Sequence, residues 1–184
     1  MEVKRIRAPL TDDAVKELKA GDSLLISGVI YTARDAAHKK LIELIEAGKD
    51  LPVDLRGQII YYMGPSPAKP GQVIGSAGPT TSGRMDDYTP TVLREGVKGV
   101  IGKGIRSKAV RKAFQDYKAV YMAAAGGAGA LLAKRIKKSE VVSYPELGPE
   151  AIHRLLVDDF PVVVINDTHG NDFYEEGRRK YFVE

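Results

Sequence analysis

The stretch SLLISGVIYTARDAAHKKLIELIEAGKD, residues 23–50, decides the fold class of this 184-residue chain. Its first part, SLLISGVIYTA, is apolar and rich in β-branched residues, which favours a strand. Apolar residues then recur at helical spacing, at Ala37, Leu41, Leu44 and Ile45. Thr32 followed by Asp35 matches a capping signature, and Gly48 marks the end of the helix. A strand leading directly into a helix indicates an α/β protein.

The same alternation continues on both sides of this unit. We predict an edge strand over KRIRAP and a helix over AVKELKAGD, capped within Thr11-Asp12-Asp13. Further strands are expected over RGQIIYYMG (56–64), VKGVIGKG and KAVYMAAA. Further helices are expected over PTVLREG, which Thr89 would cap and which could begin earlier, near Arg84, and over RSKAVRKAFQDY and GGAGALLAKRI. Near the end, Pro161 separates two apolar runs, the first compatible with either strand or helix. With no internal repeat, we predict a single α/β domain over residues 1–184.

Composition excludes several classes of protein. The chain has no cysteine, which excludes disulfides, thiolate catalysis and any cysteine-ligated metal or iron–sulfur site on this chain. No apolar run approaches the length that spans a bilayer and the N-terminus lacks a secretory signal, so we expect no membrane partner and a cytoplasmic location. The net charge is +4, and basic residues are densest in RSKAVRK and AKRIKK. We interpret both patches as solvated faces of helices.

The segment SAGPTTSGRMD, residues 76–86, is the first candidate site. Its glycines permit close backbone approach, and Thr80, Thr81 and Ser82 offer hydroxyl groups that can donate or accept. Arg84 provides a rigid fork suited to a carboxylate or a phosphate. The alternative is a flexible solvent loop. The segment is not a P-loop, because the G-x-x-x-x-G-K-[ST] pattern is missing.

Two further cations lie next to predicted elements. Arg34 falls in the first turn of its helix, where a cation is unfavourable unless an anion joins it, and His38 lies on the same helix face. Lys103 stands between glycines at the end of a strand, a common place for a binding group in α/β folds. The alternative for Arg34 is an ordinary surface arginine, and for His38 a packed or exposed helix residue. The alternative for Lys103 is a lysine in a surface turn.

The remaining motifs give weaker evidence of a functional site. AAAGGAGA, residues 123–130, follows a strand and opens a helix, but its spacing is not G-x-G-x-x-G, so close packing is the better interpretation. His153 lies in an apolar run and is interpreted as structural, and His169 lies in the predicted turn NDTHGND. No metal-ligand spacing or Ser-His-Asp arrangement is recognisable. The chain also lacks an aromatic-studded strand of the RNA-recognition type, so we expect no nucleic-acid partner.

Taken in order, ARDAAH, GPTTSGRMD and IGKG resemble segments of the β-subunit, or C-terminal domain, of the class I iron–sulfur hydro-lyases. These are the oxygen-sensitive fumarases and the related L(+)-tartrate dehydratases. The resemblance covers nearly the whole chain, from GDSLLISGVIYTARDAAHKK to VDDFPVVVINDTHGNDFY. It implies a three-layer β/β/α swivelling domain. It also implies a cysteine-bearing α-subunit that holds a [4Fe–4S] cluster with an open iron, often in a heterotetramer.

The resemblance also implies roles for individual residues. Arg34 and Arg84 would each contact a substrate carboxylate, Lys103 would be a third cation near the dicarboxylate, and Thr81 would join the substrate-binding set. Thr80 would move the proton at carbon, which requires a site that stabilises its alkoxide or relays the proton. The implied reaction is reversible hydration of fumarate to L-malate, with tartrate dehydration to oxaloacetate as the alternative. A non-catalytic basic interaction or nucleic-acid-binding module is a further alternative.

Overall fold

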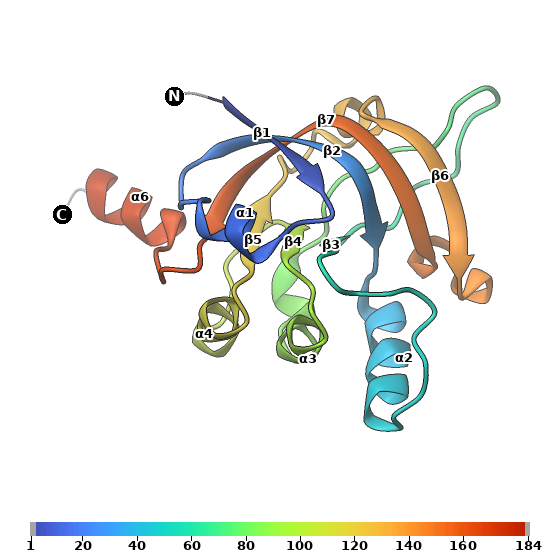
Figure 1. Cartoon of the computed structure of the whole chain (residues 1–184). Helices are drawn as coiled ribbons and strands as arrows, with labels where there is room; N and C mark the ends of the chain where they lie inside the picture. Colours follow the sequence, from blue (N-terminus) through green and yellow to red (C-terminus); the bar gives the residue numbers. More distant parts are fainter. Residues whose placement is uncertain (1–2, 183–184) are drawn as a thin grey trace.

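The strands form one mixed sheet of seven strands, ordered β1-β2-β3-β4-β5-β7-β6, in a computed structural model that describes residues 3–182 (Figure 1). The strands are β1 (Val3–Ala8), β2 (Ser23–Thr32), β3 (Ile59–Tyr61), β4 (Gly99–Gly102), β5 (Val120–Ala123), β6 (Ile136–Ser143) and β7 (Ile152–Asn166). Strands β1 to β5 run parallel to their neighbours, whereas β7 is antiparallel to β2, β5 and β6. Because β7 pairs with both β2 and β5, the sheet closes on itself. The predicted α/β class is confirmed.

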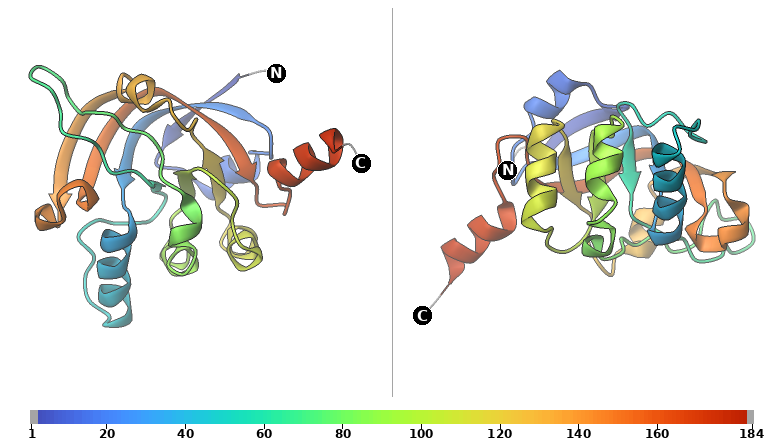
Figure 2. Two further views of the ribbon diagram at one scale, coloured as in Figure 1. Left: turned by 180° about the vertical axis from the view of Figure 1, so that it is seen from behind. Right: turned by 90° about the horizontal axis from the view of Figure 1, so that it is seen from below.

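The first four helices each connect two parallel strands. They are α1 (Asp12–Lys16), α2 (Asp35–Glu46), α3 (Thr89–Arg94), α4 (Lys108–Asp116), α5 (Gly129–Ala133) and α6 (Phe173–Tyr181), with 3₁₀ helices η1 (Ser82–Met85) and η2 (Pro145–Glu150). Helices α2, α3 and α4 lie together on one side of β3, β4 and β5, and the longer strands arch over the other side (Figure 1, Figure 2). Helix α6 projects away from the rest of the molecule. Among residues 3–182, no helix combines the length and the apolar character that a membrane crossing requires.

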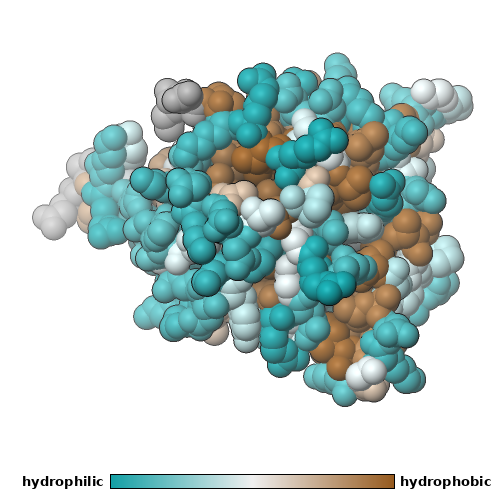
Figure 3. Space-filling view, viewed as in Figure 1, coloured by the Kyte–Doolittle hydropathy of each residue, from teal (hydrophilic) through white to brown (hydrophobic). Residues whose placement is uncertain are grey.

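Strand β3 contributes to two hydrophobic cores. Ile59 and Tyr61 pack in the core enclosed by the curved sheet, whereas Ile60 and Tyr62 pack in the core under the helices. All four are fully buried or nearly so. Successive side chains of a strand point to opposite faces, so the run IIYY fits a strand that is covered on both sides. On the face seen in Figure 3 hydrophilic residues predominate, and hydrophobic residues gather near the top of the view and in a band on its right-hand side.

The predicted unit of β2 and α2 is confirmed, but the predicted cap of its helix is wrong. Thr32 belongs to β2, where its hydroxyl donates to the Ala151 carbonyl at 3.3 Å and accepts from the His153 N–H at 3.0 Å. The N-cap residue is Arg34, whose side chain makes no capping bond. Glu150, far away in sequence, instead accepts from the Ala36 N–H at 2.8 Å. A carboxylate at this helix N-terminus satisfies a free N–H group and complements the helix dipole.

Three other elements differ from the sequence prediction. The patch AKRIKK is not helical throughout, because α5 ends at Ala133 and Ile136 begins β6, which pairs with β7. The second difference is at α3, where the N-cap is Tyr88 and the Thr89 hydroxyl donates to the Met85 carbonyl. The third is that both C-terminal apolar runs form the single strand β7, which continues through Pro161.

Candidate functional site

Thr80, Thr81 and Lys103 lie where parallel strands end. Strands β2, β3 and β4 end at Thr32, Tyr61 and Gly102, and parallel strands end at the same edge of a sheet. The segment 75–86 crosses this edge as an ordered strap. The Thr80 N–H donates to the Tyr62 carbonyl at 2.8 Å, and Thr81 forms a parallel bridge with Lys103. The alternative of a flexible solvent loop is therefore wrong for this segment.

Arg84 and Arg34 meet around one carboxylate. Arg84 Nη2 donates to Asp35 Oδ2 and to Thr80 Oγ1, each at 3.0 Å. Arg34 Nη2 lies 3.7 Å from the same Asp35 oxygen and 3.6 Å from Glu150 Oε1. Arg84 is about half exposed, since 49% of its side chain remains accessible. The exposed part of Arg84 is accessible to an external carboxylate, which can compete with Asp35 for its guanidinium group.

The backbone of Gly64, which follows β3, packs closely against the Arg34 side chain. A Cβ atom added at Gly64 would lie 2.9 Å from Arg34 Nη1 and 2.7 Å from the Pro149 carbonyl oxygen. Only glycine allows that approach without a shift of backbone or side chain. Among the described residues 3–182, the buried Arg34 Nε has no hydrogen-bond partner. Arg34 is therefore a partly buried group with donor capacity to spare, which is unlike the surface arginine of the alternative interpretation.

Lys103 lies on the other side of the threonine pair. Its Nζ donates to Thr81 Oγ1 at 3.1 Å, and its N–H donates to Ser82 Oγ at 3.1 Å. A Cβ atom at Gly102 would lie 1.9 Å from that Ser82 oxygen, so the glycine before Lys103 is required for the contact. The structure thus brings Thr80, Arg84 and Arg34 together, and connects Lys103 to the same strap through Thr81.

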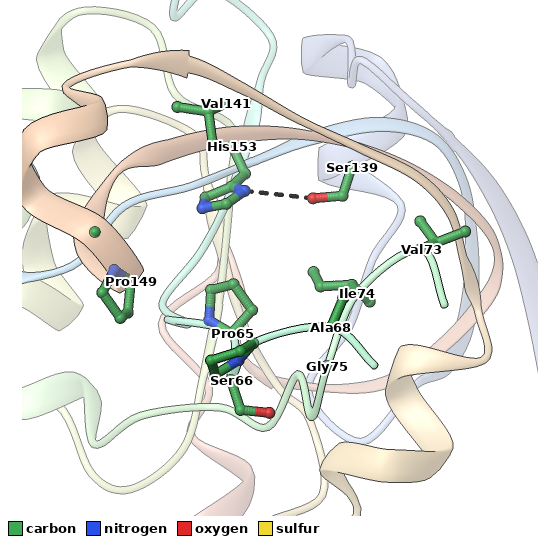
Figure 4. A pocket seen from close by; sticks show the side chains of 12 residues that line it. Pro65, Ser66, Ala68, Val73, Ile74, Gly75, Ser139, Val141, Pro149 and His153 are labelled. Atoms are coloured by element: carbon green, nitrogen blue, oxygen red, sulfur yellow. Dashed lines mark hydrogen bonds between the residues drawn. The ribbon is translucent and has the colours of Figure 1, made fainter. Parts of the chain in front are cut away.

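The other motifs singled out in the sequence lie away from the three candidate cations or take part in packing. In the 123–130 segment, a Cβ at Gly129 would lie 2.3 Å from Ser76 Oγ and 2.9 Å from Gly78 N, so the start of α5 packs closely against the loop and not, as the sequence predicted, against a strand. His169 lies in a turn organised by Asp167, which accepts from the His169 N–H at 2.9 Å. His153 faces Ser139 across 3.3 Å in a cavity of about 410 Å³ (Figure 4). None of the three candidate cations lines this cavity, so it is separate from the site at the strand ends.

His38 is packed rather than available at the site. The ring is fully buried, its Nδ1 lies 2.9 Å from the Arg34 carbonyl oxygen, and it contacts the rings of Tyr62 and Tyr88. Burial lowers the pKa of His38 from 6.5 to about 4. At neutral pH the ring is therefore uncharged, and its place supports the packed alternative.

This burial predicts a pH dependence of stability. Between pH 6.5 and about 4 the unfolded chain binds more protons at His38 than the folded chain does, so the free energy of unfolding falls as the pH drops through this window. We expect His38 to account for a loss of about 2 kcal/mol between pH 8 and pH 5. Denaturant unfolding at both pH values should show that His38→Phe reduces the difference by this amount. An identical pH dependence in the variant would contradict the burial argument.

The basic patch RSKAVRK is not a solvated face throughout. Arg106 is buried and pairs with Asp86 through an Nε–Oδ1 contact of 2.7 Å. Arg111 pairs with Asp172 and Glu175. These contacts occupy cationic groups that a nucleic-acid surface would need to leave free for phosphates. Spacing alone gave no signal for the burial of Arg106, because a single arginine after GKG has no periodic pattern.

No ligand set for a metal is present on the described part of the chain. Among residues 3–182, no group of three or more His, Cys, Asp or Glu side chains is placed to hold a metal ion. The sequence contains no cysteine to supply thiolates for an iron–sulfur cluster. The cations and hydroxyls of the site suit an anionic substrate, and its two carboxylates, Asp35 and Glu150, are paired with arginines.

Comparison with known proteins identifies the family of this chain. Residues 1–177 match the family model described as Fumarase C-terminus. The chain is 44% identical over 179 residues to a protein of Methanocaldococcus jannaschii named as a candidate L(+)-tartrate dehydratase subunit beta, covering 94% of this chain and 92% of that protein. It is 44% identical over 155 residues to the anaerobic class I fumarate hydratase of Escherichia coli, covering 83% of this chain and 28% of that protein. It is 42% identical over 155 residues to the mitochondrial fumarate hydratase 1 of Leishmania major, covering 83% of this chain and 28% of that protein. The chain therefore spans less than a third of these two fumarate hydratases.

Proposed function

This chain belongs to the Fumarase C-terminus family, and from that premise we propose that it is the β-subunit of a two-subunit hydro-lyase that reversibly hydrates fumarate to L-malate. The observation that carries the proposal is the convergence of Arg34 and Arg84 on one carboxylate oxygen, with Thr80 bonded to Arg84. In the unliganded chain, Asp35 occupies the position that we assign to a substrate carboxylate. A dicarboxylate would displace it and engage both arginines.

The chain's own residues bind and orient the substrate in this account. Arg34 and Arg84 grip a carboxylate, and Lys103 with Thr81 contacts the other end of the dianion. The same cations stabilise the extra negative charge that develops on a carboxylate when the neighbouring C–H proton leaves. Arg84 also donates to the Thr80 oxygen at 3.0 Å, and a cationic donor favours the deprotonated hydroxyl. Thr80 is therefore our candidate for moving the proton at carbon.

We further propose that a companion α-subunit completes the enzyme. The fumarate hydratases that resemble this chain are more than three times as long as the matched segment, whereas the M. jannaschii subunit is nearly coextensive with it. A cysteine-bearing companion would hold a [4Fe–4S] cluster, whose open iron supplies Lewis-acid activation of the hydroxyl that is added or lost. The assembly would be a heterotetramer. The two cores on opposite faces of β3 support the three-layer β/β/α swivelling description for a single domain over residues 1–184.

Dehydration of L(+)-tartrate to oxaloacetate is the second candidate. The observation that favours it is the full-length match to the M. jannaschii protein. Both substrates are dicarboxylates, so the same cations suit either one. Anaerobic assay of the assembled complex with fumarate and L(+)-tartrate in parallel decides between them. We expect fumarate to give the higher kcat/KM, and a clear preference for tartrate would replace the first assignment with the second.

A further inference from the structure

A buried arginine lies directly beneath the candidate site. The side chain of Arg106 has no exposed surface, although it carries a full charge. Its Nε donates to Asp86 Oδ1 and its Nη2 to Thr89 Oγ1, both at 2.7 Å. The guanidinium also lies 5.0 to 5.6 Å from the ring centroids of Tyr121, Tyr62 and Phe114. Three rings, one carboxylate and one hydroxyl therefore hold this cation in a single orientation.

The contacts of Arg106 join the two segments that carry the candidate cations. Asp86 follows η1, which contains Arg84, and Arg106 follows Lys103 by three residues. Asp86 Oδ2 accepts a second bond from the Ser107 N–H at 2.7 Å. One carboxylate thus bridges a side chain and a backbone group of the segment after Lys103. These bonds add to the direct bonds between Ser82 and Lys103, and together they restrict where Arg84 lies relative to Lys103.

The hydroxyl groups of Tyr121 and Tyr62 make further hydrogen bonds near Arg106. The Tyr121 hydroxyl donates to the Gly104 carbonyl at 2.8 Å, and its oxygen lies 3.0 Å from Ser82 Oγ. The Tyr62 and Thr89 hydroxyls are 2.8 Å apart. Of the three rings around Arg106, Tyr121 therefore bonds both the strap and the segment after β4, and Tyr62 bonds Thr89 at the start of α3. Among the contacts that the structure describes in residues 3–182, Arg106 and Asp86 form the only ion pair between these two segments.

Stability alone is a weak reason for such a cluster. Well-packed apolar residues often replace a buried ion pair at no loss of stability. The planar guanidinium group of arginine, in contrast, fixes the directions of its hydrogen bonds. We propose that Arg106 is a positioning residue, which holds Arg84 and Lys103 at the separation that a dicarboxylate requires by acting through Asp86 and Thr89. This inference rests on the proposed function, because it assigns the two cations to one substrate.

The test uses three variants and a matched control. Arg106→Lys keeps the charge and removes the fork. Arg106→Met leaves Asp86 buried without its cation and is expected to fold poorly, so it is combined with Asp86→Asn, which removes both charges. Arg56→Lys is the control, because Arg56 also forms a fork with a carboxylate, Asp54, but is 81% exposed and lies at the other end of β3.

Two readouts keep the inference separate from the proposed function. The first is amide hydrogen exchange of the folded chain over residues 78–89 and 102–107. The second is KM and kcat of the assembled complex. For Arg106→Lys we expect exchange to rise in these segments alone, and KM for the dicarboxylate to rise about 10-fold or more while kcat falls less. Arg56→Lys should leave both readouts unchanged.

The double variant distinguishes positioning from simple stabilisation. We expect Arg106→Met with Asp86→Asn to regain thermal stability relative to Arg106→Met, yet to keep fast exchange and a high KM. Recovery of exchange protection and KM together with stability would overturn the inference, as would wild-type behaviour of Arg106→Lys. If the wild-type complex converts neither fumarate nor tartrate, the proposed function fails. The exchange data then decide the positioning role alone: a local rise supports it, and unchanged exchange refutes it.

Discussion

Replacing Arg84 with methionine should lower kcat/KM of the assembled enzyme for its dicarboxylate about 10³-fold, which corresponds to about 4 kcal/mol of transition-state stabilisation. The variant removes a charge-assisted contact to a carboxylate and also the donor to Thr80 Oγ1 at 3.0 Å. Loss of a bond to a charged group leaves that group unpaired and costs more than an ordinary hydrogen bond. Steady-state kinetics of the complex measures the loss.

The fold should survive this substitution. Arg84 and Asp35 are both partly exposed, and exposed ion pairs contribute about 1 kcal/mol or less to stability. Arg84→Lys keeps the charge without the planar fork, so we expect an intermediate kcat/KM. Arg56→Gln, at the opposite end of the strands, is the control and should retain wild-type kinetics. Full activity of Arg84→Met in a correctly assembled complex would remove Arg84 from the site.

Replacing Thr80 with valine should lower kcat about 10²- to 10³-fold, a loss typical of removing a proton-transfer group, and change KM much less. The backbone of Thr80 is held by its bond to the Tyr62 carbonyl at 2.8 Å, so the substitution removes the hydroxyl without releasing the strap. Thr80→Ser keeps a hydroxyl at the same backbone position and should recover much of kcat. Thr91→Val, in α3, is the matched control.

An isotope measurement shows whether Thr80 acts on the proton. Proton transfer becomes more rate-limiting when its catalyst is impaired. With substrate deuterated at the carbon that loses the proton, the isotope effect on kcat should therefore be larger in Thr80→Ser than in the wild type. A Thr80→Val enzyme whose loss lies entirely in KM, with an unchanged isotope effect, would assign this threonine to binding alone.

Local pattern predicted the strands and helices well where side chains repeat regularly. The apolar run 23–33 and the helical spacing after it became β2 and α2, and the first three residues of IIYY became β3, which is buried on both faces. The pairing of β2 with β7 was not predictable in this way, because it joins residues more than a hundred positions apart. The same long-range contact explains the missed cap, since Glu150 reaches α2 from outside the local sequence.

The cations of the candidate site were predictable from the sequence, but the residues that contact and position them were not. Arg34, Arg84 and Lys103 follow predicted strands or lie in a glycine-rich segment, and the resemblance to a known family placed them together. Asp35 was predicted only as a cap, whereas in the structure it accepts from Arg84 at 3.0 Å. Arg106 was assigned to a solvated face, and its burial depends on three aromatic rings from other elements. Such contacts follow from packing, which sequence spacing does not report.

Anaerobic turnover of separated and recombined subunits tests the central claim most directly. This chain and its cysteine-bearing companion are assayed alone and mixed, each with fumarate as substrate. The account predicts activity only in the mixture, because this chain supplies the cations and the hydroxyl but has no cysteine with which to hold a cluster. Turnover by the companion alone, at the rate of the mixture, would contradict the claim that Arg34, Arg84 and Lys103 form part of the active site.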